Sequence, residues 1–409
     1  MKLSQSFLKT FRNAPKDETA KSAQYLIRAG YLHKELAGVY DFMPLGLKVI
    51  EKITTIVREE LNKIGGQEIE MSGLQNPESW QKSARWDASA MDVWFKTSLQ
   101  AGGELGLAPT HEEPITAMMR EYISSYKDLP AYPYQFQTKF RNELRAKSGI
   151  MRTREFLMND LYSFSIDEQS HLEFYKKAEE AYRTIFERVG LGNCTFKTFA
   201  SGGAFSKYSH EFQTLLDVGE DTIWFNEDKS VVINSEILND EVLADFGVSR
   251  DELQSARAAE TGNIFTLGYR FSEPLGLIYD DREGNRTPVF MGSYGIGISR
   301  LMGVIAEKFS DDKGLIWPES VAPFRYHLIA IGDNGTKKAE ELCQAHPDLF
   351  LYDDRDLRPG VKFADVELMG LPDRVVISDK TLENNQVEIT HRANGESKLL
   401  TLNDFVAKL

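Results

Sequence analysis

"YPYQFQTKFRNELRAKSGIMRTREFLMNDLYSFS", residues 132–165, places a basic loop between two aromatic-rich segments. Residues 132–141 and 156–165 alternate in character along the chain, and the connection between them contains Gly149. Aromatic residues at a period of two, on either side of a glycine-containing loop, predict a pair of antiparallel strands. We therefore expect a hairpin with a long basic connection.

The basic residues of this connection suit a polyphosphate ligand. The segment 139–156 carries six of them in a chain whose formal net charge is −14: Lys139, Arg141, Arg145, Lys147, Arg152 and Arg154. A guanidinium offers paired donors to phosphate oxygens and keeps its charge, so a nucleotide is the expected ligand. The alternative is a solvated basic loop without a ligand.

A glycine-rich stretch further along suggests a second phosphate clamp. "TPVFMGSYGIGISRLMGVIAEKF", residues 287–309, predicts a strand, then spaced glycines, then a helix with Arg300 in its first turn. A dinucleotide fingerprint is excluded because Arg300 stands where its last glycine is required. Glycines that let the backbone approach a ligand fit this pattern, and glycines that pack a helix against a sheet are the alternative.

A third motif, "LAPTHEEPIT" at residues 107–116, indicates an ammonium site. Zinc chemistry of the HExxH type is excluded because Ile115 occupies the position of the second histidine. On an extended segment Thr110 and Glu112 point to the same side and can hold the ammonium of an amino acid. The same pattern is common in helix caps, which is the alternative.

Length and composition indicate a globular protein of two or three domains. The chain has 409 residues, of which 42% are hydrophobic and 27% charged. Neither a membrane span of roughly 18 apolar residues nor a secretion signal is evident, so we expect a cytoplasmic protein. Cys194 and Cys343 lack the spacing of a zinc site or a disulfide framework.

Apolar spacing predicts an amphipathic helix in residues 44–66, followed by a strand that ends at Pro77; this pair suits core packing and a dimer interface equally. A second helix is expected at 173–192. Residues 226–259 predict a short strand and one or two surface helices, and form a candidate insertion or linker.

The stretch "PESVAP", residues 318–323, marks a domain boundary. We therefore expect domains at 1–320 and 321–409, the second with alternating strands and helices.

The order of these motifs resembles the class II aminoacyl-tRNA synthetases, in which FRxE is motif 2 and GxGxxR is motif 3. Motif 1 corresponds to the helix and strand ending at Pro77. The segments "RAGYLHKELAGVYDFMPLGLKVIEKI", "SYKDLPAYPYQFQTKFRNE", "GLIWPESVAPF" and "DDRDLRPGVKFADVELMGLPDRVVISDK" narrow the resemblance to prolyl-tRNA synthetases of the bacterial type. The resemblance covers nearly the whole chain.

The resemblance implies an α+β class II catalytic domain, an antiparallel sheet flanked by helices, followed by an α/β anticodon-binding domain. It implies activation of proline by ATP with Mg²⁺, transfer of the prolyl group to tRNA(Pro), and a homodimer. An inactive synthetase-like tRNA-binding or regulatory paralogue is the alternative, although both motif arginines are kept. A threonine or histidine enzyme is disfavoured by "SYGIGISR" and "KFADVELMG".

The resemblance also assigns residues to the ligands. For ATP it implies Arg141 at the α-phosphate, Arg152 and Arg300 at the other phosphates, Phe156 stacked on adenine, Glu143 at the adenine amine, and Glu211 or Glu260 at Mg²⁺. For proline it implies Thr110, Glu112, Arg141, His210, Phe265 and Ser293. For the anticodon it implies Asp354, Arg355, Lys362 and Asp365, for which a structural ion-pair network is the alternative.

Three departures from the family pattern bear on specificity. Residues 226–259 stand where bacterial-type relatives carry a large editing insertion, Asn263 and Thr266 replace the usual residues, and "RAKSG" at 145–149 departs from the motif 2 loop. A small pocket discriminates weakly against amino acids of similar size, by about 1 to 3 kcal/mol. We therefore expect that this chain does not itself edit alanyl-tRNA, and a separate trans-editing factor is a candidate partner.

Overall fold

The hairpin expected around the basic loop is present in the computed structural model, which describes residues 1–144, 146, 148–202 and 207–409. Strand β7 (Pro133–Phe140) pairs antiparallel with β8 (Glu155–Ser165), so that Phe140 lies opposite Glu155. The 3-10 helix η3 (Gly149–Met151) shapes the connection. Arg145 and Lys147 of the basic loop lie outside the described residues.

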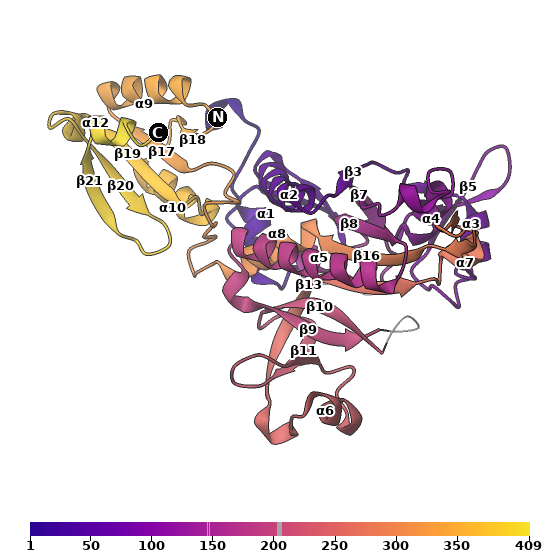
Figure 1. Ribbon diagram of the computed structural model, residues 1–409. Coiled ribbons are helices and arrows are strands. Elements are labelled where there is room, and N and C mark those ends of the chain that lie inside the picture. The colour runs from indigo at the N-terminus through magenta and orange to yellow at the C-terminus, as the bar shows by residue number, and fades with distance from the viewer. Residues whose placement is uncertain (145, 147, 203–206) are drawn as a thin grey trace. The chain divides into compact units, whose positions relative to one another are not determined.

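These two strands belong to a nine-stranded sheet that is antiparallel in most of its pairs. Its order is β10-β9-β12-β11-β13-β16-β8-β7-β3, so β16 lies between β8 and β13 (Figure 1). The remaining strands are β3 (Gln67–Glu68), β9 (Thr195–Ser201), β10 (Tyr208–Leu215), β11 (Asp221–Phe225), β12 (Val232–Asn234), β13 (Gln254–Gly268) and β16 (Phe290–Gly297).

Helix α5 (Glu168–Arg188) covers one face of this sheet and confirms the helix expected at 173–192. Its apolar residues recur at helical spacing and are buried, among them Phe174, Tyr182 and Phe186. The ring of Phe174 meets the ring of Tyr294 of β16 edge to face, with centroids 5.6 Å apart. One sheet face is therefore closed by α5, and the opposite face is left for other groups.

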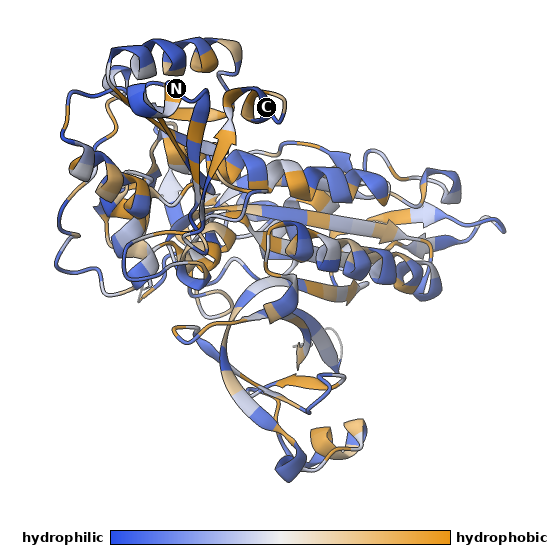
Figure 2. Cartoon of the chain, turned by 90° about the vertical axis from the view of Figure 1, so that its left-hand side faces the viewer, coloured by the Kyte–Doolittle hydropathy of each residue, from blue (hydrophilic) through white to orange (hydrophobic). Residues whose placement is uncertain are grey.

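At one end the sheet closes on itself. Because β10 pairs with β13 as well as with β9, the strands β13, β10, β9, β12 and β11 form a ring (Figure 2), whose interior includes Ile223, Val232 and Ala258. The segment 226–259 contributes the short strand β12 and the helix α6 (Asp240–Phe246), as predicted. The prediction that all of it is an insertion or linker is wrong, because residues 254–259 open β13 and pair within the ring.

Smaller elements complete this part of the chain. They are β4 (Leu74–Gln75), α3 (Pro77–Lys82), β5 (Phe95–Ser98), β6 (Glu104–Leu107), α4 (Glu112–Met119), η2 (Tyr126–Asp128), η4 (Gly192–Cys194), η5 (Arg250–Glu252), α7 (Ser272–Leu275), β14 (Ile278–Asp280), β15 (Arg286–Pro288) and α8 (Ile298–Lys308). The single strand expected before Pro77 is instead two short strands in different sheets. Pro77 begins α3, capped by the Asn76 side chain.

The chain divides into two compact units, residues 37–39 with 54–304, and residues 1–36, 40–53 and 305–409. The second contains a five-stranded sheet of order β18-β17-β19-β20-β21, in which β17 pairs parallel with β18 and β19. Its elements are η1 (Leu3–Gln5), α1 (Lys21–Arg28), β1 (Leu32–Leu36), β2 (Val39–Phe42), β17 (Tyr326–Ile331), α9 (Asp333–Ala345), β18 (Phe350–Asp353), α10 (Pro359–Met369), β19 (Asp373–Ser378), α11 (Asp379–Leu382), β20 (Gln386–His391), β21 (Ser397–Thr401) and α12 (Leu402–Val406).

The predicted alternation of strands and helices is confirmed from β17 to β19, and two antiparallel strands then extend the sheet. The predicted amphipathic helix is α2 (Pro44–Lys63). The boundary at 320/321 stays a prediction, since the compact unit also takes in residues 305–320 and N-terminal segments. None of the helices in the described ranges combines the length and apolar character that a bilayer span requires.

Replacement of Gly292 by alanine is expected to destabilise the packing of α5 on the sheet. A Cβ there would lie 2.5 Å from His171 Cε1 and 2.7 Å from Ser163 Oγ. Overpacking of this kind costs about 1 to 3 kcal/mol, which lowers the melting temperature by about 2 to 12 °C. Differential scanning fluorimetry measures the shift. Gly73→Ala, whose Cβ would meet its nearest neighbour at 4.0 Å, is the matched control, and equal melting temperatures for the two variants would contradict this packing.

Candidate active site

The candidate site lies on the sheet face that α5 leaves open. Side chains alternate between the two faces of a strand, so residues paired across neighbouring strands point the same way. Along β8 this face carries Phe156, Met158, Asp160 and Tyr162. Ser293 of β16 pairs with Tyr162, and Phe265 of β13 pairs with Ser293. Residues that are far apart in the sequence therefore share one surface.

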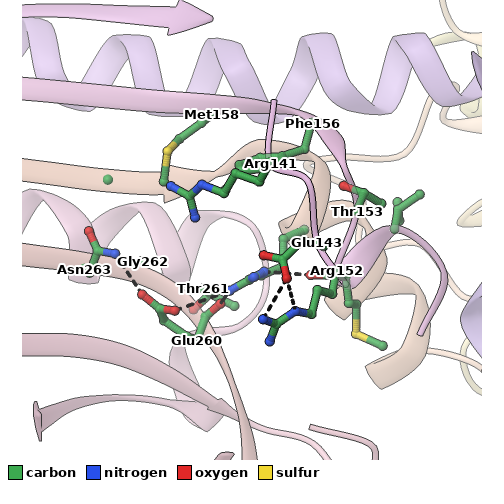
Figure 3. A pocket seen from close by; sticks show the side chains of 15 residues that line it. Arg141, Glu143, Arg152, Thr153, Phe156, Met158, Glu260, Thr261, Gly262 and Asn263 are labelled. Atoms are coloured by element: carbon green, nitrogen blue, oxygen red, sulfur yellow. Dashed lines mark hydrogen bonds and ion pairs between the residues drawn. The ribbon is translucent and has the colours of Figure 1, made fainter. Parts of the chain in front are cut away.

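A first cavity on this face brings three arginines together. Arg141 follows β7, Arg152 ends the loop of the hairpin, and Arg300 is the third residue of α8. All three line the cavity, as do Phe156, Glu143 and Glu260 (Figure 3). The expected meeting of three distant guanidinium groups at one cavity is therefore present in the structure.

Each arginine is oriented by protein oxygens. Arg152 donates to Glu143 Oε2 at 2.9 Å and to Glu220 Oε2 at 2.9 Å. Arg300 donates from Nε to the carbonyl oxygen of Met151 at 2.8 Å and from Nη1 to the carbonyl oxygen of Glu260 at 2.7 Å. These bonds hold two of the guanidinium groups in place before any ligand arrives.

Arg141 is the least compensated of the three. Its Nε donates to the carbonyl oxygen of Pro109 at 3.2 Å, and its guanidinium lies 5.2 Å from the centre of the Phe156 ring. Burial lowers the pKa of Arg141, and the positive charge of Arg300 lowers it further. The guanidinium remains charged at neutral pH, so this part of the cavity favours an anion.

A second cavity of about 290 Å³ adjoins the first. Arg141, Glu143, Met158, Asn263 and Gly295 line both cavities. The expected residues Thr110, Glu112, Phe265 and Ser293 line the second, together with Arg85, Met91, Val93, Pro109, Asp160 and Tyr162. Its wall thus combines apolar side chains with carboxylates and the guanidinium groups of Arg85 and Arg141, a composition that suits a small zwitterion.

Thr110 and Glu112 meet in this second cavity by a different geometry from the one expected. Glu112 begins helix α4, so the segment is a helix start and not an extended strand. Thr110 Oγ1 donates to Glu112 Oε2 at 2.6 Å, and Ser293 Oγ lies 3.5 Å from Glu112 Oε1. The hydroxyl and the carboxylate still face the same space.

The structure does not bring His210 to the cavity, contrary to the sequence expectation. His210 pairs with Ile264 and Glu211 with Asn263, so the two neighbours on β10 point to opposite faces. His210 Nδ1 lies 2.6 Å from the Tyr175 hydroxyl of α5, on the covered face. Burial lowers the pKa of His210 to about 4, which keeps this ring neutral.

Glu211, on the open face, is a buried carboxyl group close to a second one. Its Oε2 accepts hydrogen bonds from Gln213 Nε2 at 2.9 Å and Asn234 Nδ2 at 3.0 Å. Burial and then the charge of Glu260 raise its pKa to about 8. Glu260 lines the first cavity and accepts from Asn263 Nδ2 at 2.8 Å (Figure 3). The two carboxyl groups together suit a cation that binds oxygen ligands.

The glycines of β16 serve both of the purposes that the sequence left open. Gly295 lines both cavities, and a Cβ there would come within 3.0 Å of Asn263 Oδ1 and 3.1 Å of Met158 Cε. Gly297 lines the first cavity, opposite Met158. Gly292, one residue out of phase, makes room for α5 on the covered face.

Sequence reasoning missed three residues with polar side chains in the second cavity, Asp160, Tyr162 and Arg85. Asp160 and Tyr162 follow Phe156 at a spacing of two on β8, so strand alternation from Phe156 predicts their position. Arg85 had no such signal. Its Nη1 lies 3.1 Å from Glu113 Oε1 and 3.7 Å from Glu112 Oε2. Burial raises the pKa of Glu113 to about 7.

The residues expected to read an anticodon are held in a network of internal contacts. Arg355 donates to Asp353 Oδ2 at 2.6 Å and to Asp365 Oδ2 at 2.8 Å. Lys362 is 8% exposed, and its ammonium donates to the carbonyl oxygen of Asp353 at 3.0 Å. Asp354 accepts from the Ser4 backbone at 2.8 Å. These contacts fit the structural ion-pair interpretation.

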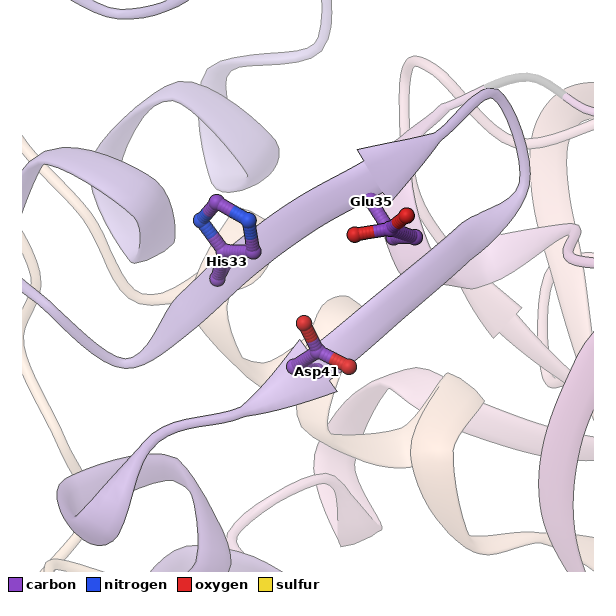
Figure 4. Close-up of side chains that lie close together, drawn as sticks. All are labelled: His33, Glu35 and Asp41. Atoms are coloured by element: carbon purple, nitrogen blue, oxygen red, sulfur yellow. The ribbon is translucent and has the colours of Figure 1, made fainter.

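A separate group of possible metal ligands lies on the β1–β2 hairpin. His33, Glu35 and Asp41 have ligand atoms within 4.8 Å of one another, and all three are exposed (Figure 4). Exposed groups of this kind are common without an ion, and these residues line neither cavity of the candidate site. We assign no metal to them.

Two segments of the chain match known protein families. Residues 95–309 match the tRNA synthetase class II core domain (G, H, P, S and T), and residues 325–409 match the anticodon binding domain. The fold is therefore a class II core followed by an anticodon-binding domain.

Curated relatives are similar over their whole length. The chain is 36% identical over 425 residues to proline–tRNA ligase of Anaplasma marginale (strain St. Maries), with 100% of each protein covered. It is 37% identical over 426 residues to that of Wolbachia pipientis wMel, again with 100% of each covered. Among solved structures, prolyl-tRNA synthetase from Cryptosporidium parvum complexed with halofuginone and AMPPNP superposes with a TM-score of 0.78 at 18% identity, covering 95% of this chain and 75% of that one.

Proposed function

The chain belongs to the proline–tRNA ligases, class II aminoacyl-tRNA synthetases, and on this premise we propose that its two adjoining cavities bind ATP and proline. The enzyme activates proline with ATP to prolyl-adenylate and transfers the prolyl group to tRNA(Pro). One observation carries the assignment of the site: Arg141, Arg152 and Arg300 line a single cavity next to one that holds Thr110 and Glu112.

Arg141 has the central role because it lines both cavities. Activation joins the carboxylate of proline to the α-phosphorus of ATP and releases pyrophosphate. Negative charge accumulates where these two groups meet, and a fixed guanidinium stabilises it without reorganisation. The two cavities also hold the reactants in a productive orientation, which lowers the entropic part of the barrier.

The remaining residues of the first cavity suit the rest of ATP. Phe156 offers a ring on which adenine stacks, and Glu143 offers an acceptor for the adenine amine. Arg152 and Arg300 bind the other phosphate oxygens. Since Arg152 is paired with Glu143 and Glu220 in the free site, phosphate competes with two carboxylates for it.

The second cavity suits proline. Its secondary ammonium donates to Glu112 and Thr110, and the pyrrolidine ring packs against Phe265 beside Ser293. A pocket of this kind excludes larger side chains by size, whereas it discriminates against alanine by only about 1 to 3 kcal/mol. We therefore propose that a separate factor removes alanyl-tRNA. Accumulation of alanyl-tRNA(Pro) with the purified enzyme alone supports this, and its hydrolysis by the enzyme contradicts it.

Mg²⁺ fits the paired carboxyl groups Glu260 and Glu211. Their oxygens are the ligands that Mg²⁺ prefers, and the raised pKa of Glu211 reflects negative charges that a cation would balance. When bound there, the ion neutralises phosphate charge. Glu260 holds its position through its hydrogen bond with Asn263, one of the positions where this chain departs from its family.

Mg²⁺ binding is expected to strengthen as the pH rises toward 8. The pKa of Glu211 is raised to about 8, so below that pH the group is protonated and must lose its proton to bind the ion. The apparent Kd for Mg²⁺ should fall by up to about tenfold per pH unit between pH 6.5 and 8 and level off above. Magnesium titrations of the exchange reaction measure it. In Glu211→Gln the pH dependence of the apparent Kd for Mg²⁺ between pH 6.5 and 8 should vanish. An unchanged pH dependence in this variant would contradict the assignment of Glu211 to the ion.

We further propose a cytoplasmic homodimer that binds tRNA(Pro) through its C-terminal domain. Helix α2 and the edge strand β3 are the elements that correspond to motif 1, which supports their use in the dimer. Arg355, Lys362, Asp354 and Asp365 would shape the anticodon surface from within, since their side chains are engaged with neighbours.

Proline-dependent ATP–pyrophosphate exchange tests the function. We expect exchange with proline and much less with alanine or threonine. Exchange with another amino acid but not with proline would overturn the substrate assignment. No exchange with any amino acid, in a protein that still binds tRNA, would favour the inactive paralogue.

A further inference from the structure

A lysine that the proposed reaction does not use lies under the amino-acid cavity. Lys139 of β7 is 0% exposed and is among the largest fully buried side chains. Its ammonium lies 2.6 Å from Asp160 Oδ1 and 2.7 Å from His111 Nδ1. Burying a charge is costly unless it is paired, so these two contacts are what keeps Lys139 in this position.

His111 connects Lys139 to the loop that carries the ammonium-binding residues. Burial lowers the pKa of His111 to about 4, so the ring is neutral. Its Nδ1 accepts from the Lys139 ammonium, and its Nε2 donates to the Ser72 carbonyl oxygen at 3.2 Å. His111 stands between Thr110 and Glu112 in the chain. Fixing the His111 ring therefore fixes the backbone from which both neighbours reach the cavity.

Asp160 connects Lys139 to the opposite wall. Its Oδ2 accepts from the Tyr162 hydroxyl at 3.0 Å and from Gln135 Nε2 at 2.9 Å. Asp160 and Tyr162 both line the amino-acid cavity, whereas Lys139 does not. The Lys139 ammonium, 2.6 Å from Asp160 Oδ1, therefore fixes the carboxylate to which Tyr162 is hydrogen-bonded.

We propose that Lys139 is a positioning residue for the amino-acid substrate: it ties the Thr110–Glu112 segment, through His111, to the Asp160–Tyr162 wall. The ammonium stays behind the wall, so it fixes both sides without repelling the cationic amino group. The proposal rests on the assignment of this cavity to proline. Since Lys139 contacts the amino-acid side of the site, its loss should affect proline and not ATP.

The test separates binding from folding. In Lys139→Met we expect the KM for proline in the exchange reaction to rise at least tenfold while the KM for ATP changes less than twofold. Lys139→Met leaves the Asp160 carboxylate without its partner and should lower the thermal stability. The double variant Lys139→Met/Asp160→Asn removes both charges and is expected to regain that stability. Its KM for proline should stay raised at least tenfold, and because Asp160 itself lines the cavity, the variant His111→Leu, which keeps both charges, decides whether the link through Lys139 carries the effect.

Two further variants complete the test. His111→Leu leaves the Lys139–Asp160 pair intact and removes only the link to the Thr110–Glu112 segment, and its KM for proline should also rise. Lys176→Met, on the exposed side of α5, is the matched control and should behave as wild type. A wild-type KM for proline in either the double variant or His111→Leu, or a parallel rise in the KM for ATP, overturns the proposal. Absence of proline-dependent exchange in the wild type overturns the proposed function instead.

Discussion

Arg141→Ala is expected to abolish proline-dependent ATP–pyrophosphate exchange and to leave the fold intact. Arg141 lines both cavities, and within the described residues its side chain makes one hydrogen bond, from Nε to the Pro109 carbonyl oxygen. Its removal therefore breaks few hydrogen bonds of the framework but takes away the positive charge that is proposed to stabilise the reacting groups. Loss of one such preorganised donor lowers kcat by about 10²- to 10³-fold.

The measurement is exchange of labelled pyrophosphate into ATP at saturating proline, with circular dichroism to verify folding. Arg183→Ala is the matched control, since Arg183 lies on the exposed side of α5 and pairs with Glu179 one turn earlier. We expect the control to retain full activity. Arg141→Lys should recover little, because a lysine cannot offer paired donors to two anionic groups. An alanine variant with more than a tenth of wild-type exchange would refute the role given to Arg141.

Glu112→Gln is expected to raise the KM for proline and to leave the KM for ATP nearly unchanged. Glu112 is the carboxylate that Thr110 and Ser293 orient in the amino-acid cavity. The amide keeps the size of the side chain but removes the charge that the proline ammonium meets. Loss of one partner of a buried charge pair costs about 2 to 5 kcal/mol, so the KM should rise at least about 30-fold.

Steady-state exchange with either substrate varied measures this split between proline and ATP. Glu121→Gln, an exposed position shortly after α4, is the control and should leave both constants at their wild-type values. If Glu112→Gln raises both constants equally, the carboxylate acts on the site as a whole and its assignment to the ammonium is wrong.

Much of the fold follows from local pattern. Period-two alternation of aromatic residues predicts β7 and β8, and helical spacing predicts α2 and α5, because each buries one face. The strand–glycine–helix order around Arg300 is also as predicted. The strand expected before Pro77 differs because Asn76 and Pro77 favour a helix start.

The site was less predictable, for reasons of geometry. A motif names residues but not the face of the strand on which each lies. His210 was therefore predicted to line the cavity, whereas the register of β10 turns Glu211 toward the open face and His210 away from it. Lys139 belonged to the basic run and shares the strand face of Phe156, and only its tertiary contacts with Asp160 and His111 distinguish its buried ammonium from the cavity-lining Arg141. Arg85 reaches the cavity through loop packing, which leaves no periodic pattern in the sequence.

The position of β16 in the sheet determines when the candidate site can assemble as the chain is translated. β16 pairs with β8 on one side and β13 on the other, yet it is translated after both of them. A nascent chain that ends before residue 290 has Phe156 and Asn263 on strands with no hydrogen-bonded strand to join them. The catalytic surface therefore assembles late, through contacts of high sequence separation, and translation arrested at that point would yield a polypeptide that cannot bind its nucleotide.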